Sequence, residues 1–202
     1  LHTEQVFYPT LTPRTGWSEQ APELIWQAFI KCISRTVRHF NAPPQGIGLS
    51  TAMHSLIAVN KDGDPLMNMI TWADNRSAAI AERIRNGSGG ECLYQETGTP
   101  VHTMAPVCKI IWLKEHEPEL FAKTHKFISI KEYVWFKLFG VFEVDYSIAS
   151  ATGLFAILKN TWSDYALTLA GISTEKLSIS VPTSFLRVGV LIDVLNQTGL
   201  TE

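Results

Sequence analysis

The chain has 202 residues, a formal net charge of −2 and 46% hydrophobic residues, enough for one substantial core. Near-neutral charge without a basic run argues against a nucleic-acid partner or an anionic membrane surface, since both need clustered Lys and Arg. No apolar stretch approaches the roughly 20 residues of a membrane-spanning helix, and the polar start does not resemble a signal peptide. Cys32, Cys92 and Cys108 lack the spacing of a disulfide framework or a zinc site, so we expect a cytoplasmic protein.

In the first third of the chain, a β-prone run at residues 6–9 is expected to lie in a sheet. Apolar residues at spacings of three and four over residues 24–37 then predict an amphipathic helix. Apolar runs at 47–49 and 56–59, followed by dense turn residues at 60–65, predict a hairpin.

Beyond residue 76, helical and strand patterns alternate. Helices are predicted at 77–85, 93–98, 106–116, from 118, and at 131–139, 163–170 and 190–198, with strands at 127–130 and 141–146 and an apolar run over 148–158 continuing to 162. Gly140, Gly171 and Gly199 are placed to end three of the helices. This alternation predicts an α/β fold with a mixed sheet flanked by helices on both faces.

The candidate site residues follow the apolar runs. Met53 and His54 lie in the predicted hairpin, while the run over 66–71 delivers Trp72, Asp74 and Arg76 to the start of the next helix. Residues at strand ends commonly line pockets in α/β proteins. Together they offer hydrogen-bonding groups, an aromatic face and a cation, which suit a polyol or a sugar acid. His102, in a later loop, is a further candidate.

Each of these residues has a structural alternative. His54 can be a buried histidine satisfied by one backbone partner, and Trp72 can be a core aromatic. Asp74 and Arg76 can form an ion pair at a helix entry, with Asp74 as the cap. Met53 can pack in the core, and exposed-loop polarity explains His102 equally well.

Residues 104–116 resemble the first signature of the FGGY carbohydrate kinases, through Met104, Pro106, Lys109, Trp112 and Glu115. The resemblance extends over nearly the whole chain, including residues 17–20, 52–55, 70–77, 97–100, 130–133 and 144–151. Within the family, the patterns around 53–54 and 71–76 are most similar to those of gluconate kinases, with xylulose kinases next. Lys109 and Trp112 are expected to serve packing and a structural charge pair.

The resemblance implies an actin-like ATPase architecture of two RNase H-like domains, with sugar and ATP bound between them. Residues 1–202 resemble the N-terminal, sugar-binding domain. The first strand, the phosphate-binding hairpin and the C-terminal nucleotide-binding domain with its general-base aspartate are expected to lie outside this chain. We therefore expect no catalytic, nucleotide-binding or metal-binding residue here, and an inactive fragment.

For the complete enzyme, the resemblance implies ATP and Mg²⁺ as cofactors and conversion of gluconate to 6-phosphogluconate. The expected substrate-binding residues are Met53, His54, Trp72, Asp74, Arg76 and His102. The positions of Met53 and His54 match the sugar-contacting pair of xylulose kinases, and Trp72 matches a substrate-site tryptophan of glycerol kinases. Three alternatives remain open: a kinase for xylulose or another ketose or polyol, a non-catalytic sugar-binding module, and a remnant whose core survives without function. Exposed sheet edges also allow a homodimer.

Overall fold

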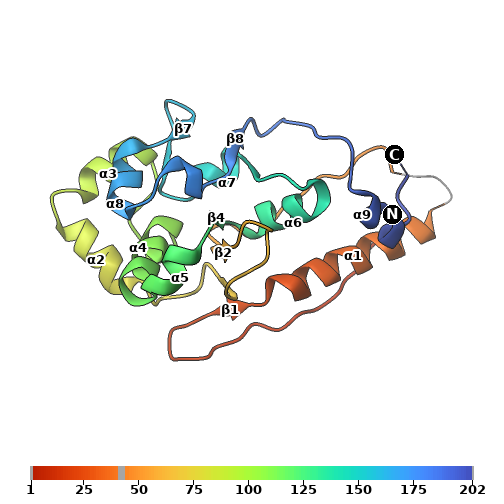
Figure 1. Ribbon diagram of the computed structural model, residues 1–202, viewed down its shortest axis with the longest axis horizontal. Helices are drawn as coiled ribbons and strands as arrows, with labels where there is room; N and C mark the ends of the chain where they lie inside the picture. Colours follow the sequence, from red (N-terminus) through yellow and green to blue (C-terminus); the bar gives the residue numbers. More distant parts are fainter. Residues whose placement is uncertain (1, 41–43, 202) are drawn as a thin grey trace.

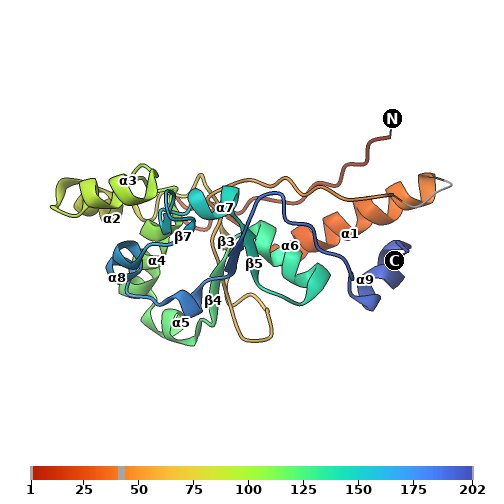
Figure 2. The same ribbon diagram turned by 90° about the horizontal axis from the view of Figure 1, so that it is seen from above.

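The computed structural model describes residues 2–40 and 44–201. Its short strands lie between two groups of helices, with α2, α3, α4, α5 and α8 towards one end and α1, α6 and α9 towards the other (Figure 1). Figure 2 shows the same order from above. The expectation of an α/β fold with helices on both sides of the strands is confirmed, but the strands pair as two-stranded sheets rather than as one mixed sheet.

The helices follow the sequence patterns closely. Their bounds are α1 Pro22–His39, α2 Ala78–Asn86, α3 Gly90–Thr97, α4 Pro106–His116, α5 Pro118–Lys123, α6 Ile130–Phe139, α7 Tyr146–Ser150, α8 Asp164–Ala170, the 3-10 helix η1 Thr174–Lys176, and α9 Ile192–Thr198. Gly140, Gly171 and Gly199 adopt left-handed backbone angles just after α6, α8 and α9. Glycine reaches these angles without a steric penalty, so each helix ends where the sequence predicts.

The strands are short and their pairing is mixed. Their bounds are β1 Glu19–Gln20, β2 Ile57–Val59, β3 Met69–Ile70, β4 Lys126–Ile128, β5 Glu143–Asp145, β6 Phe155–Ala156, β7 Thr161–Trp162 and β8 Ile179–Val181. β1 pairs with β3 and β2 with β4, both antiparallel, and a bridge between Leu56 and Ile70 connects the two pairs. β5 and β8 are parallel, and β6 and β7 form a small hairpin.

Two hydrophobic clusters cover the two faces of the central strands. Leu56 and Ala58 face the cluster that contains α2, α4 and α8, whereas Ile57 and Val59 face the cluster that contains α1 and α6. Successive side chains of a strand point to opposite faces, so a strand buried on both sides is apolar throughout. This explains the unbroken apolar run at residues 56–59. Burial on both faces also holds in place the strand that follows His54.

Three local expectations are wrong. Residues 6–9 form no strand, and Phe7 is 84% exposed. Residues 47–49 form no strand either; the antiparallel hairpin instead joins residues 56–59 to 65–70. The apolar run over 148–158 is not one continuous element: residues 146–150 form α7, because Asp145 accepts a hydrogen bond from the backbone N–H of Ser147 and caps the helix, and β6 follows at 155–156.

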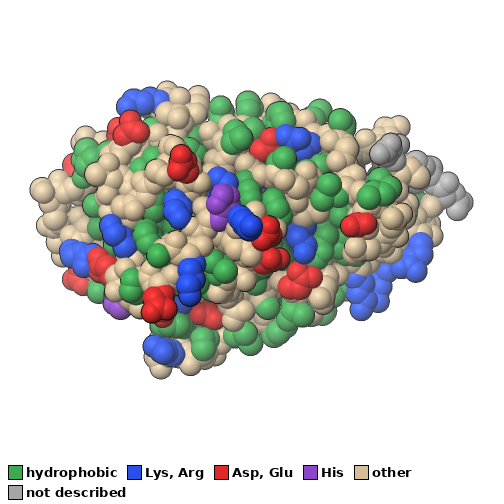
Figure 3. All heavy atoms as spheres, viewed as in Figure 1, with side chains coloured by type: hydrophobic (Ala, Val, Ile, Leu, Met, Phe, Trp, Pro, Cys, Tyr) green, Lys and Arg blue, Asp and Glu red, His purple; other side chains and the backbone are tan. Residues whose placement is uncertain are grey.

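In the described ranges, none of the helices is both long and apolar enough to cross a membrane. On the face shown in Figure 3, acidic and basic side chains are interspersed rather than gathered into a patch of one sign.

Candidate functional site

Three loops that carry the predicted site residues meet at one end of the central strands. The Lys109 Nζ atom of α4 donates to the carbonyl oxygens of His54, at 2.5 Å, and Thr71, at 2.8 Å. The loop at 102–104 joins them, because Thr103 Oγ1 donates to Asn75 Oδ1 at 3.2 Å and its carbonyl accepts from Ser77 Oγ at 3.0 Å. The structure therefore brings the Met53–His54, Trp72 and His102 segments together.

Trp72 and Met53 present apolar surface at this end of the domain. Trp72 is 58% exposed and Met53 39% exposed. Burying either side chain fully would be favourable by about 1.5–3 kcal/mol, so their exposure at the same end of the domain has no packing rationale. An exposed indole beside polar groups is suited to the C–H face of a sugar.

His54 is half-buried and has a positive φ of 62°. Its Nδ1 atom lies 2.9 Å from the carbonyl oxygen of Ala151. A carbonyl can only accept, so Nδ1 carries the proton and Nε2 is left as an acceptor. Burial lowers the pKa of His54; the bond to Ala151 opposes this, and the nearby Lys109 and His102 add to the lowering. At neutral pH the imidazole is therefore uncharged.

His102 holds the opposite tautomer. The backbone N–H of Met104 donates to His102 Nδ1 at 3.2 Å, so Nδ1 is the acceptor and the neutral ring carries its proton on Nε2. This side chain is exposed. One loop thus contributes a ring-nitrogen acceptor and the other a ring-nitrogen donor, a complementary pair for the hydroxyl and carboxylate groups of a polyol acid.

Asp74 and Arg76 lie behind this surface. The Asp74 carboxylate is 0% exposed and accepts from the backbone N–H of Ser18 at 2.6 Å and from the backbone N–H, Nε and Nη2 of Arg76, each at 2.9 Å. The guanidinium of Arg76, 3% exposed, also pairs with Glu19 at 2.6 Å and stacks on Trp17 at 3.7 Å. These contacts favour the ion-pair alternative over direct contact with a ligand.

Lys109 is the residue whose role the sequence did not indicate. Instead of the expected charge pair, it has no carboxylate within ion-pair distance among residues 2–40 and 44–201, and it binds two carbonyl oxygens. Its place in the signature motif was the only sequence signal that Lys109 has a specific role. Its two carbonyl partners could not be predicted, because they depend on how α4 packs against the rest of the domain.

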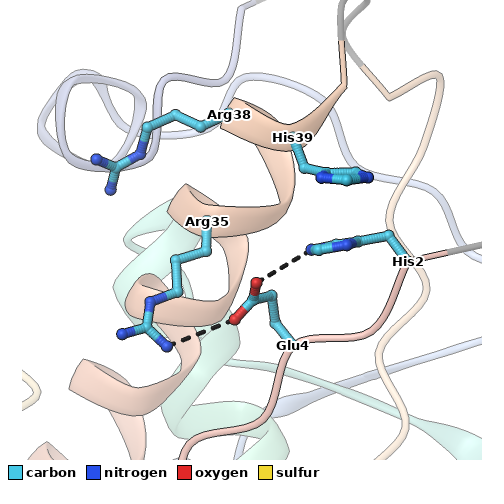
Figure 4. A pocket seen from close by; sticks show the side chains of 5 residues that line it. All are labelled: His2, Glu4, Arg35, Arg38 and His39. Carbon is cyan, nitrogen blue, oxygen red and sulfur yellow. Dashed lines mark hydrogen bonds and ion pairs between the residues drawn. The ribbon is translucent and has the colours of Figure 1, made fainter.

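The described structure has one small interior cavity beside His54 and one larger surface hollow away from it. His54 lines an interior cavity of about 20 Å³, room for a single water molecule, together with Ser55, Ser129 and Glu132. A larger hollow of about 440 Å³ lies over the C-terminal half of α1, lined by Arg35, Arg38, His39, His2 and Glu4. In Figure 4, Glu4 lies between Arg35 and His2 and pairs with both, whereas Arg38, as far as the described residues show, donates only to Ser34.

No group of three His, Cys, Asp or Glu side chains in the described part of the chain is arranged to hold a metal ion. We therefore assign no step through a metal to these residues.

Comparison with known proteins identifies the family. A model of the FGGY family of carbohydrate kinases, N-terminal domain, matches residues 1–202, and the chain belongs to this family. The gluconokinase of Bacillus licheniformis is 42% identical over 185 residues, covering 91% of this chain and 36% of that protein. The xylulose kinase of Bacillus subtilis (strain 168) is 34% identical over 198 residues, covering 96% and 40%.

A crystal structure of gluconate kinase from Lactobacillus acidophilus superposes with a TM-score of 0.93 at 31% identity, covering 96% of this chain and 39% of that one. The chain therefore spans well under half the length of the proteins it resembles.

Proposed function

We propose that this chain is the RNase H-like, sugar-binding half of an actin-like kinase that transfers the γ-phosphate of ATP to gluconate, forming 6-phosphogluconate. The observation that carries the substrate assignment is the higher identity to gluconokinase than to xylulose kinase over most of the chain. The pair of oppositely oriented imidazoles supports it, because gluconate offers both hydroxyl donors and a carboxylate acceptor.

In this proposal the chain holds and orients the sugar. Met53 and Trp72 cover its C–H surface, His54 Nε2 accepts from a hydroxyl, and His102 Nε2–H donates to the carboxylate or to a hydroxyl oxygen. Asp74 and Arg76 bind Ser18 and Glu19 and so support the loop that follows Trp72. Because the guanidinium of Arg76 is already bound by two carboxylates, the substrate carboxylate depends on His102 and nearby backbone amides.

Phosphoryl transfer also needs a phosphate cradle, a Mg²⁺ ion and a base at the attacking hydroxyl. We propose that the phosphate hairpin and the general-base aspartate belong to the rest of a complete enzyme; among the described residues, no group of side chains is arranged to hold a metal ion. We propose that the remainder of a complete enzyme supplies ATP and Mg²⁺ binding, and that this chain alone does not turn over. The three free cysteines suit a reducing cytoplasm.

A second candidate is a xylulose kinase. It is favoured by the match to xylulose kinase over nearly the whole chain and by the engagement of Arg76, which leaves no exposed guanidinium at this position for a carboxylate. The two candidates share the roles of Met53, His54 and Trp72 and differ in what His102 contacts.

The test is ADP release from Mg-ATP by the whole protein that carries this domain, with gluconate, xylulose, ribulose and glycerol as acceptors. We expect selectivity for gluconate, a KM for gluconate about tenfold higher in His54→Ala, and a larger rise for gluconate than for xylulose in His102→Ala. The exposed His125 lies outside the site, so His125→Ala is the matched control. Preference for a ketose would favour the second candidate, and sugar binding without turnover would favour a non-catalytic module.

A further inference from the structure

Lys109 stands apart from the other lysines near the site because it is completely buried. Its residue exposure is 0%, in the middle of α4, whose neighbouring residues Cys108 and Ile110 are also fully buried. A buried ammonium is normally paired with a carboxylate. In the described ranges Lys109 instead donates only to the carbonyl oxygens of His54 and Thr71.

Both carbonyls belong to the segments that present the proposed sugar contacts. His54 is itself a contact residue, and Thr71 immediately precedes Trp72. A single nitrogen therefore holds the two segments within hydrogen-bond reach of one point. The constraint is strongest at His54, where a positive φ of 62° is costly for a residue with a β-carbon and needs support from its surroundings.

The chemistry of the amine fits this contact in both protonation states. Burial lowers the pKa of Lys109 to about 7, with the negative charge of Asp74 opposing the shift and the charge of Arg76 adding to it. The charged form has three N–H bonds and the neutral amine has two. Two are enough for two carbonyls, so the contact does not depend on the positive charge.

We infer that Lys109 is a positioning residue of the sugar site, where its Nζ atom fixes the separation between the Met53–His54 segment and Trp72. The inference deepens the proposed function and rests on it for the identity of the ligand. A residue in this role affects sugar affinity through the backbone, without touching the sugar.

The test compares three variants of the whole protein. Lys109→Met keeps an unbranched side chain, one bond shorter than lysine, and has no donor. Lys109→Gln keeps two N–H donors without a charge, one bond closer to the backbone. Lys114→Met removes an exposed lysine of the same helix and is the control.

We expect Lys109→Met to raise the KM for the sugar about tenfold or more, with the KM for ATP unchanged, because two buried acceptors lose their donor. Lys109→Gln should lie between wild type and Lys109→Met, and Lys114→Met should match wild type. If Lys109→Met does not fold, the Gln variant carries the comparison. An unchanged sugar KM in the Lys109 variants, or equal changes in the KM values for sugar and ATP, would overturn the inference.

Hydrogen exchange separates this inference from the proposed function. In the Lys109 variants, peptides covering residues 50–56 and 69–76 should exchange faster than in wild type, while α8 and α9 stay protected. If the wild-type protein phosphorylates none of the four acceptors, the proposed function fails, and the exchange data still decide whether Lys109 fixes the two segments. Unchanged exchange in both segments would refute the positioning role.

Discussion

The Asp74–Arg76 pair allows a sharp test of which residues support the site and which contact the ligand. Replacing Asp74 by Ala removes a carboxylate that accepts from Ser18 and three times from Arg76. The guanidinium, 3% exposed, would keep Glu19 as its carboxylate partner. Breaking a buried pair by removing one member costs about 3–5 kcal/mol. Because Glu19 remains, we expect the lower end of that range.

Urea unfolding of the chain measures this change in the free energy of unfolding, and the slope of the transition should stay constant. The double variant Asp74→Ala, Arg76→Met should cost less than the two single changes together, because the fully buried pair is removed as a unit and only Glu19, 13% exposed and still bound by Asn68, loses its cation. Glu115→Ala, which breaks the exposed pair with Arg83, should change the free energy of unfolding by about 1 kcal/mol or less. The reasoning fails if Asp74→Ala leaves stability unchanged while strongly weakening sugar binding, since the carboxylate would then be a ligand contact.

Three further predictions follow from the same residues. The pKa of Lys109 is about 7 in the folded protein against an ordinary 10.5, so between these pH values the unfolded chain binds more protons than the folded one. The free energy of unfolding of wild type, measured in urea, should therefore rise by about 1.4 kcal/mol per pH unit relative to Lys109→Met over this pH range. Because burial holds the pKa of His54 below its ordinary 6.5, the sugar KM should be flat from pH 7 to 8 in initial-rate assays and should rise only on acidification below 6.5. Trp72→Ala should raise the sugar KM about tenfold, Trp72→Phe less, and neither should lower the melting temperature measurably, because the indole is largely exposed.

Helices were predictable because their signals are local. The apolar stripe of α1, Pro22 in its first turn and Glu23 at its positive end lie within one segment, and the left-handed glycines after α6 and α8 need no distant partner. Strands were less predictable than helices, because a strand forms only where another strand pairs with it. Residues 47–49 have two apolar side chains around Gly48, which suggested a strand, but only residues 56–59 find partners, in β4 and at Ile70.

The sequence predicted which segments form the candidate site, but not the role of each residue in it. Asp74 and Arg76 are two residues apart, which suggested the local pair, yet their burial depends on Ser18 and Glu19, more than fifty positions earlier. The exposure of Trp72, which supports its proposed role, likewise depends on tertiary packing and cannot be read from its position after an apolar run. Sequence spacing alone carries no information on either point.

The residues that we propose to contact the sugar differ from those that support them, and this bears on how substrate choice can vary. His102 and the indole of Trp72 are exposed and His54 is half-buried, whereas Asp74 and Lys109 are 0% exposed and hydrogen-bonded within the domain. Substitution of an exposed group should change what the surface recognises at little cost in stability, while substitution of a buried group should change stability and the spacing of the proposed contacts. Selectivity between a sugar acid and a ketose can therefore shift through residues such as His102 while the buried support is retained, so that kinases of different acceptors can share one framework.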